Sequence, residues 1–174
     1  MQSLIVRGRV LRIGLLGLLL SLWLSYPLSA RFDVWTPIGP EPAPILALAV
    51  DPTNPNVLYA ATDGGGVFKS ADGGRSWRAA RHNLGFFVFA LAIDPRNPNI
   101  LYAGLLGRGV YKSTNGGASW RASYNETENF TVYALAIDPR NPYILYAAGS
   151  DTDTIVVSVI KSMDGGLTWS RTLT

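Results

Sequence analysis

The sequence predicts an all-β fold made of repeated four-stranded antiparallel sheets, and three observations support this prediction. Segments that begin at Ile45, Val88 and Val132 repeat one another, with equivalent positions 43 and 44 residues apart. Each repeat contains several short runs rich in β-branched and aromatic residues, separated by Gly, Pro, Asn and Asp. After residue 30 no run shows the 3.6-residue periodicity of a useful helix. A period of about 40 to 50 residues with several strands in each unit is typical of β-propeller blades.

Composition excludes several other classes of protein. Of the 174 residues, 48% are hydrophobic, which gives the chain ample apolar surface to bury and argues against disorder. The absence of cysteine excludes disulfides, thiolate metal sites and a cysteine nucleophile. The net charge of +3 is accounted for by Arg7, Arg9 and Arg12, so the rest of the chain is neutral. We therefore expect no nucleic-acid partner.

Residues 1–30 are predicted to be a helical signal peptide. A basic segment precedes the apolar run Ile13–Leu24, and Ala30 follows as a small residue suited to cleavage. The run has 12 residues, fewer than the ~20 that a membrane-spanning helix needs. An uncleaved signal-anchor is the alternative, and it would be the chain's contact with a membrane. Either reading places the folded part outside the cytoplasm: secreted, periplasmic or lumenal.

Residues 31–174 are predicted to form a partial propeller with three complete blades, at about 45–80, 88–123 and 132–173. The first strand of each blade is almost wholly apolar, as expected for a strand covered on both faces. These strands are Ile45–Val50, Val88–Ile93 and Val132–Ile137. The second strands are predicted at Val57–Ala61, Ile100–Gly104 and Ile144–Ala148, and the third end at Ser70, Ser113 and Ser162. The fourth start at Ser76, Ser119 and Thr168, and a short insertion is expected near Gly149–Ile155.

An Asp-Pro-x-Asn-Pro segment links the first two strands of every blade, at residues 51–55, 94–98 and 138–142. In the first blade, Asp51 can accept backbone hydrogen bonds at the first turn position, and Pro52 has the fixed φ that the second position favours. Pro55 delays strand pairing because proline has no backbone N–H. The segment therefore predicts a tight turn.

The hairpin between the third and fourth strands is the most specific motif: SADGGRSW, STNGGASW and SMDGGLTW. Its acid or amide can cap free backbone N–H groups, and its glycines permit positive φ. Its tryptophan is expected to be buried between neighbouring blades. The residues assigned this structural role are Ser70, Asp72, Gly74, Trp77, Ser113, Asn115, Gly117, Trp120, Ser162, Asp164, Gly166 and Trp169. A calcium or sugar site at the acid is the alternative, but a residue present in every repeat is more simply explained by architecture.

These hairpins resemble the Asp-box, S-x-D-x-G-x-T-W, of BNR-type propellers. Asn115 departs from the consensus acid but keeps the side-chain acceptor. The resemblance implies a β-propeller, of a kind shared by sortilin-type receptors, xyloglucanases, photosystem II assembly factors and sialidases. It implies fold more firmly than function. The arginine cluster, acid and tyrosine nucleophile of the sialidases cannot be placed on this chain, so we assign no catalytic residue, cofactor or metal.

Three blades are too few for a ring, which needs roughly four to eight. The segment Trp35–Pro40 resembles a lone outer strand that precedes the first blade. Two explanations stay open. The chain is either an N-terminal fragment of a longer propeller, or an open arc that associates with itself to complete the ring.

Loops on the face opposite the hairpins are expected to vary and to bind ligand. The candidate residues there are Arg81, His82, Phe86, Phe87, Arg108, Glu126, Glu128, Asp151 and Asp153. Cations and aromatic rings suit stacking on a sugar or peptide, although Phe87 could instead seal adjacent blades. The paired acids could hold calcium or simply be solvated. A single histidine cannot form a catalytic triad or a His-based metal site.

The sequence thus favours a non-enzymatic binding or scaffolding module with a protein or glycan ligand. The competing hypothesis is a carbohydrate-active glycoside hydrolase, or a piece of one, because such enzymes need paired carboxylic acids. Its acids would come from Asp63, Glu126, Glu128, Asp151 or Asp153.

Overall fold

The computed structural model describes residues 39–40, 43–124, 129–151, 153 and 156–173. The predicted leader and most of the lone strand at Trp35–Pro40 lie outside these residues, and Gly39 and Pro40 are not in a strand. Every described residue belongs to one compact unit within residues 37–174. Within the described ranges, no helix is long and apolar enough to cross a membrane.

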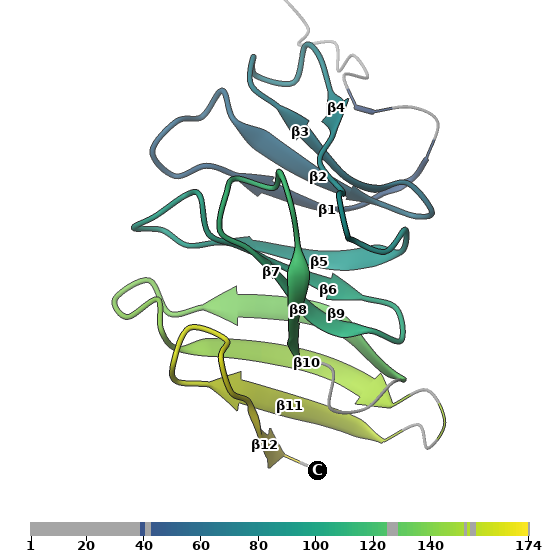
Figure 1. Cartoon of the computed structure of the whole chain (residues 1–174), viewed down its shortest axis with the longest axis vertical. Helices are drawn as coiled ribbons and strands as arrows, with labels where there is room; N and C mark the ends of the chain where they lie inside the picture. Colours follow the sequence, from purple (N-terminus) through teal and green to yellow (C-terminus); the bar gives the residue numbers. More distant parts are fainter. Residues whose placement is uncertain (1–38, 41–42, 125–128, 152, 154–155, 174) are drawn as a thin grey trace, which may run out of the picture. The chain divides into compact units, whose positions relative to one another are not determined.

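The described chain forms three four-stranded antiparallel sheets, in which the strands pair in chain order (Figure 1). The first sheet contains β1 (Ile45–Val50), β2 (Leu58–Thr62), β3 (Gly66–Ser70) and β4 (Arg78–Ala79). The second contains β5 (Val88–Ile93), β6 (Leu101–Leu105), β7 (Gly109–Ser113) and β8 (Arg121–Tyr124). The third contains β9 (Phe130–Ile137), β10 (Leu145–Asp151), β11 (Val157–Ser162) and β12 (Ser170–Leu173). The all-β prediction and the three blades are confirmed.

Strand boundaries depart from the predictions in two informative places. The insertion expected near Gly149–Ile155 is partly strand, because β10 runs on to Asp151, which pairs with Phe130 at the start of a lengthened β9. The fourth strands begin after the tryptophan rather than at the preceding residue, and β4 keeps only two residues. The reason lies in the hairpin, whose hydrogen bonds hold the residue before the tryptophan inside the turn.

Apolar side chains fill the two spaces between successive sheets. Between the first and second sheets, Tyr59 and Val67 pack with Leu101 and Trp120. The second space repeats this arrangement one blade further on, and its buried residues include Tyr102, Val110, Leu145 and Trp169. Burial of this kind stabilises a fold by roughly 25 cal/mol per Å² of apolar surface. Each sheet therefore depends on its neighbours for its core.

The prediction that the first strand of every blade is covered on both faces is wrong for β1, and also for β9, where Tyr133 is 55% exposed. Leu48 and Val50 are 58% and 47% exposed. The equivalent side chains of β5, Leu91 and Ile93, pack against the core cluster of the preceding sheet. Among the described residues, no sheet precedes β1 to cover the same positions. Trp77 is likewise only half-buried, whereas Trp120 and Trp169 are 3% and 8% exposed.

Gly104 of β6 lies at a close approach between the second and third sheets. A Cβ at this position would lie 2.6 Å from Cγ1 of Val132 and 2.9 Å from its carbonyl oxygen. Well-packed interiors do not accommodate an added carbon so close to backbone without a shift. The glycine thus sets how tightly β9 can approach β6.

We predict that Gly104→Ala lowers the free energy of unfolding by about 1–3 kcal/mol, because the added methyl group overpacks this contact. Urea denaturation followed by tryptophan fluorescence measures the change. Gly39→Ala is the matched control, since its Cβ would lie no closer than 3.8 Å to Ile45. Equal stability of the two variants would contradict the proposed role of Gly104.

Candidate functional site

The loops of the three sheets gather at two opposite edges, as the strand order predicts. At one edge, the glycine hairpins, Ser70–Trp77, Ser113–Trp120 and Ser162–Trp169, contact the turn between the first two strands of their own sheet. In each sheet, the first hairpin glycine donates its N–H to a carbonyl of that turn at 2.9 Å. At the other edge, Gly66 donates its N–H to the carbonyl of Phe86 at 2.7 Å. The ligand-binding candidates are expected at this second edge.

Asp72 uses both carboxylate oxygens inside its own hairpin. Oδ1 accepts hydrogen bonds from the Ser70 hydroxyl at 2.8 Å and the Ser76 N–H at 2.9 Å, and Oδ2 accepts one from the Ser76 hydroxyl at 2.5 Å. The Ser76 and Ser70 hydrogen bonds lower the pKa of Asp72 from 3.8 to about 2. The equivalent network, led by the Thr168 hydroxyl and N–H, lowers the pKa of Asp164 well below its usual range. The carboxylates thus stabilise their own turns.

Asn115 shows how an amide performs the same task in the second sheet. Its Oδ1 accepts hydrogen bonds from the Ser113 hydroxyl at 3.0 Å and the Ser119 N–H at 2.9 Å. Its Nδ2 donates to the Ser119 hydroxyl at 2.8 Å. In the other two hairpins, a carboxylate oxygen lies at the place of this Nδ2 and accepts from the hydroxyl instead. The turn needs a side-chain acceptor at this position, and it does not need a charge.

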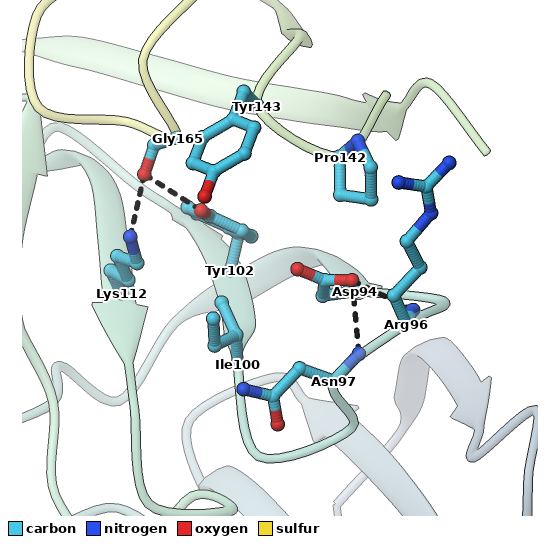
Figure 2. Close-up of a pocket in the computed structure, with 9 residues that line it drawn as sticks. All are labelled: Asp94, Arg96, Asn97, Ile100, Tyr102, Lys112, Pro142, Tyr143 and Gly165. Carbon is cyan, nitrogen blue, oxygen red and sulfur yellow. Dashed lines mark hydrogen bonds between the residues drawn. The ribbon is translucent and has the colours of Figure 1, made fainter. Parts of the chain in front are cut away.

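A tyrosine and a lysine of one sheet bind the glycine hairpin of the next. The Tyr59 hydroxyl and the Lys69 ammonium both donate to the carbonyl of Gly116 at 3.1 Å. In the next pair of sheets, Tyr102 and Lys112 donate to the carbonyl of Gly165 at 2.7 and 2.6 Å (Figure 2). This pair was not predicted from the sequence, although Leu-Tyr-Ala and Lys-Ser recur in every repeat. We call it the Tyr–Lys clamp.

A cavity of about 280 Å³ lies beside the second clamp, between the second and third sheets. Figure 2 shows Asp94, Asn97, Tyr102, Lys112 and Tyr143 around it. The carboxylate of Asp94 is buried and accepts the N–H groups of its own turn. Burial lowers the pKa of Lys112 and raises the pKa of Tyr102. These polar groups already bind protein atoms, so we interpret the cavity as part of the contact between sheets.

The candidate ligand-binding residues fall into separate groups, and one of them forms a groove. Phe86 and Phe87 are 59% and 45% exposed, and together with Arg108 they line a cavity of about 240 Å³. We call this cavity the aromatic groove. Its lining residues are Leu84, Gly85, Phe86, Phe87, Leu105, Leu106 and Arg108.

Arg81 lies beside the aromatic groove and is held there by a hydrogen bond. Its Nη1 donates to the carbonyl of Gly65 at 2.6 Å. Its guanidinium carbon is 5.8 Å from the centroid of the Phe86 ring and 5.9 Å from that of Phe68. These distances allow cation–π attraction, which fixes a positive charge against the rings.

The structure does not bring the remaining candidates into the aromatic groove. His82 lines a different cavity, with Lys69 and Arg78, and its carbonyl accepts the N–H of Trp120. Asp153 donates its N–H to Oδ1 of Asp151 and accepts the side-chain amide of Asn129. Glu126 and Glu128 lie outside the described residues. Among the residues that are described, no group of three acids or histidines could hold a metal ion.

Solved structures with similar folds are β-propellers. An ancestral GH74 enzyme is 32% identical over 80% of this chain, with a TM-score of 0.68. The GH74 enzyme of Niastella koreensis is 28% identical over 73% of this chain, with a TM-score of 0.58. This chain covers only 19% and 22% of those two chains. YCF48 bound to D1 peptide is 16% identical over 76% of this chain and 42% of its own, with a TM-score of 0.56, which shows the fold alone.

The three sheets and these similarities define the chain as part of a β-propeller. No protein-family model matches it, and no curated protein matches it. The narrower resemblance to BNR-type Asp-box propellers stays a prediction from the hairpin sequences.

We predict that Asp72→Asn combined with Asp164→Asn keeps the fold at neutral pH and weakens its acid sensitivity, because Asn115 already performs this role. A carboxylate whose pKa is lowered by folding stabilises the protein fully above about pH 4 and loses that contribution as the pH falls towards about 2. The measurement is the urea midpoint as a function of pH. The control, Asp72→Ala, removes the acceptor and should lower stability at every pH. An unchanged pH profile in the double Asn variant would contradict the prediction.

Proposed function

We propose that the chain is a non-enzymatic binding module, located outside the cytoplasm, whose protein or glycan ligand binds in the aromatic groove. The observation that carries this proposal is the exposure of two adjacent phenylalanines in a hollow flanked by arginines. Exposed aromatic rings next to polar groups are characteristic of binding sites, because such surface is costly to leave in water.

The chemistry of the groove suits a flat or partly apolar ligand that also carries hydrogen-bond acceptors. The faces of Phe86 and Phe87 can stack on a sugar ring or an apolar side chain. Arg108 presents a charged donor at the same wall, and Arg81 is positioned by Gly65 and Phe86. YCF48 has been solved with D1 peptide, but its similarity to this chain concerns the fold, so the groove itself supports the proposal.

The predicted extracytoplasmic location rests on the leader sequence, with its basic segment, its 12-residue apolar run and its small residue at position 30.

Binding to the groove is tested with a glycan array and a display library of random peptides. We expect one ligand class to bind, and Phe86→Ala combined with Phe87→Ala to weaken that binding at least about tenfold, as loss of buried aromatic anchors does at hot spots. Tyr143→Ala is the matched control, since it removes an exposed aromatic ring at the opposite edge. Binding that survives the double variant unchanged would exclude the groove as the site.

A glycoside hydrolase, or a piece of one, is the second candidate function. The identities to two GH74 enzymes favour it, although the chain spans about a fifth of their length. Such enzymes need two carboxylic acids that face each other across the substrate. Here Asp151 accepts the backbone N–H of Asp153, which is typical of a local turn. The hypothesis of a binding module is therefore better supported than that of a glycoside hydrolase.

Incubation of the purified protein with β-glucans and sialosides separates the two functions, and we expect no turnover. Turnover that Asp63→Asn, Asp151→Asn or Asp153→Asn abolishes would replace the binding module by a hydrolase. Asp72→Asn is the control, because that acid stabilises its own hairpin and should leave any turnover unchanged.

A further inference from the structure

The cavity that His82 lines lies between β4 of the first sheet and the glycine hairpin of the second sheet, and its lining is rich in basic residues. Its volume is about 320 Å³, which is in the range of ligand-binding pockets. Its lining residues are Lys69, Arg78, Ala79, Ala80, Arg81, His82, Asn115, Gly116, Gly117 and Ala118. None of these lining residues carries a carboxylate. We call it the cationic cavity.

Strand pairing places two positive charges directly opposite each other at this cavity. Lys69 of β3 pairs with Arg78 of β4, and like charges at opposite positions of an antiparallel pair repel each other. The ammonium of Lys69 donates to the carbonyl of Gly116 at 3.1 Å and can donate further hydrogen bonds. Among the described residues, no acid forms an ion pair with the guanidinium of Arg78. Arg78 therefore lacks a counter-charge.

The contact between the second and third sheets repeats the same pair and provides an internal comparison. There Lys112 lies opposite Arg121, but the charges of two acids, Asp94 and Asp164, act on the lysine. Asp164 belongs to the glycine hairpin that Lys112 binds. At this second contact, the hairpin itself supplies a negative charge beside the two cations.

At the first contact, the hairpin acid is replaced by an amide. Asp51, the equivalent of Asp94, lies close enough to Lys69 for their charges to interact. The equivalent of Asp164 is Asn115, which lines the cationic cavity. The turn does not require this amide, because a carboxylate makes the same backbone contacts in the other two hairpins. The substitution therefore changes the charge of the cavity without changing the design of the hairpin.

Two further positions differ in the same direction. Where the second sheet has Tyr124 and Asn125, the first sheet has Arg81 and His82, and both of these line the cationic cavity. The guanidinium of Arg81 is held beside the aromatic groove, so it adds its charge from the side. Each of the three differences removes a negative charge or adds a group that can carry a positive one.

We infer that the cationic cavity is a binding site for an oxyanion of the phosphate or sulfate type, either free or attached to a sugar. Lys69 and Arg78 supply two permanent positive charges. A dianion balances both charges and offsets their repulsion, whereas a carboxylate balances only one. The planar fork of arginine and the ammonium of lysine are the donors that proteins use for such groups. The site is separate from the aromatic groove and does not rest on the ligand proposed there.

The test is isothermal titration calorimetry of the purified full chain with inorganic sulfate and inorganic phosphate. Sodium chloride keeps the ionic strength constant, so that general screening is the same in every titration. We expect both ions to bind, and acetate to bind at least about tenfold more weakly because it carries a single charge. Titration with glucose 6-sulfate and glucose 6-phosphate then distinguishes the sources: tighter binding than the free ion assigns the site to a sugar-borne group, and weaker binding assigns it to the free ion.

Asn115→Asp is the most informative variant. It restores the acid of the other two hairpins, so the fold should be retained, as circular dichroism would show. It should weaken sulfate binding at least about tenfold, because it returns a negative charge to the wall of the cavity.

Arg78→Gln tests the cation itself, since Arg78 is exposed and its removal leaves the Tyr–Lys clamp intact. We expect it to weaken sulfate binding by about tenfold or more, the effect of losing one charge-assisted hydrogen bond. Arg121→Gln is the matched control, because Arg121 is the exposed equivalent at the second contact. This control should bind sulfate like the unmodified chain.

Three results would overturn the inference: a chain that binds neither sulfate nor phosphate, acetate that binds as tightly as sulfate, or an Arg121→Gln variant that loses as much affinity as Arg78→Gln. The last result would assign the binding to the general charge of the surface. Phe86→Ala combined with Phe87→Ala should leave sulfate binding unchanged, so failure of this site and failure of the aromatic groove are distinguishable.

Discussion

The contact on which the rest of the structure depends is the Tyr–Lys clamp on the hairpin of the following sheet. A four-stranded sheet of short strands is marginal alone, and it becomes stable when both faces are covered. The clamp supplies direction to an otherwise non-directional apolar contact. Two donors fix one carbonyl, and the hairpin glycines admit the tyrosine ring at close range: a Cβ on Gly117 would lie 3.1 Å from the Tyr59 ring. Successive blades are thereby held in one register.

Features set by neighbouring residues in the chain could be predicted from the sequence, and features set by distant residues could not. The period located the three sheets, and the acid and the serine located the hairpins because the partners of their side chains lie within four residues. The clamp joins residues 47 to 63 positions apart, so its tyrosine and lysine looked like ordinary strand residues. The burial of Trp77 and β1 was overestimated for the same reason, since local pattern does not show whether a neighbouring sheet exists.

The ligand-binding candidates were identified by residue type, and only their placement could sort them. Phe86, Phe87 and Arg108 come together because the loop before β5 meets the loop after β6, where Leu106 donates its N–H to the carbonyl of Phe87. His82 is close to them in sequence, but it lines a different cavity, and its carbonyl accepts the N–H of Trp120. Arg81 shows that a charged candidate can be partly structural, since it is tied to Gly65.

The aromatic groove and the clamp are consequences of the same packing. The groove takes Phe86 and Phe87 from the connection between the first two sheets and Leu105 from the second, so its walls keep their spacing only while those sheets stay in contact. Leu84 and Leu105 belong both to the groove and to the core cluster that this contact buries. A similar link joins the next two sheets, where Gly107 donates its N–H to the hydroxyl of Thr131. The loops at this edge therefore bridge blades, and the position of the aromatic groove depends on the same sheet contacts that bury the core.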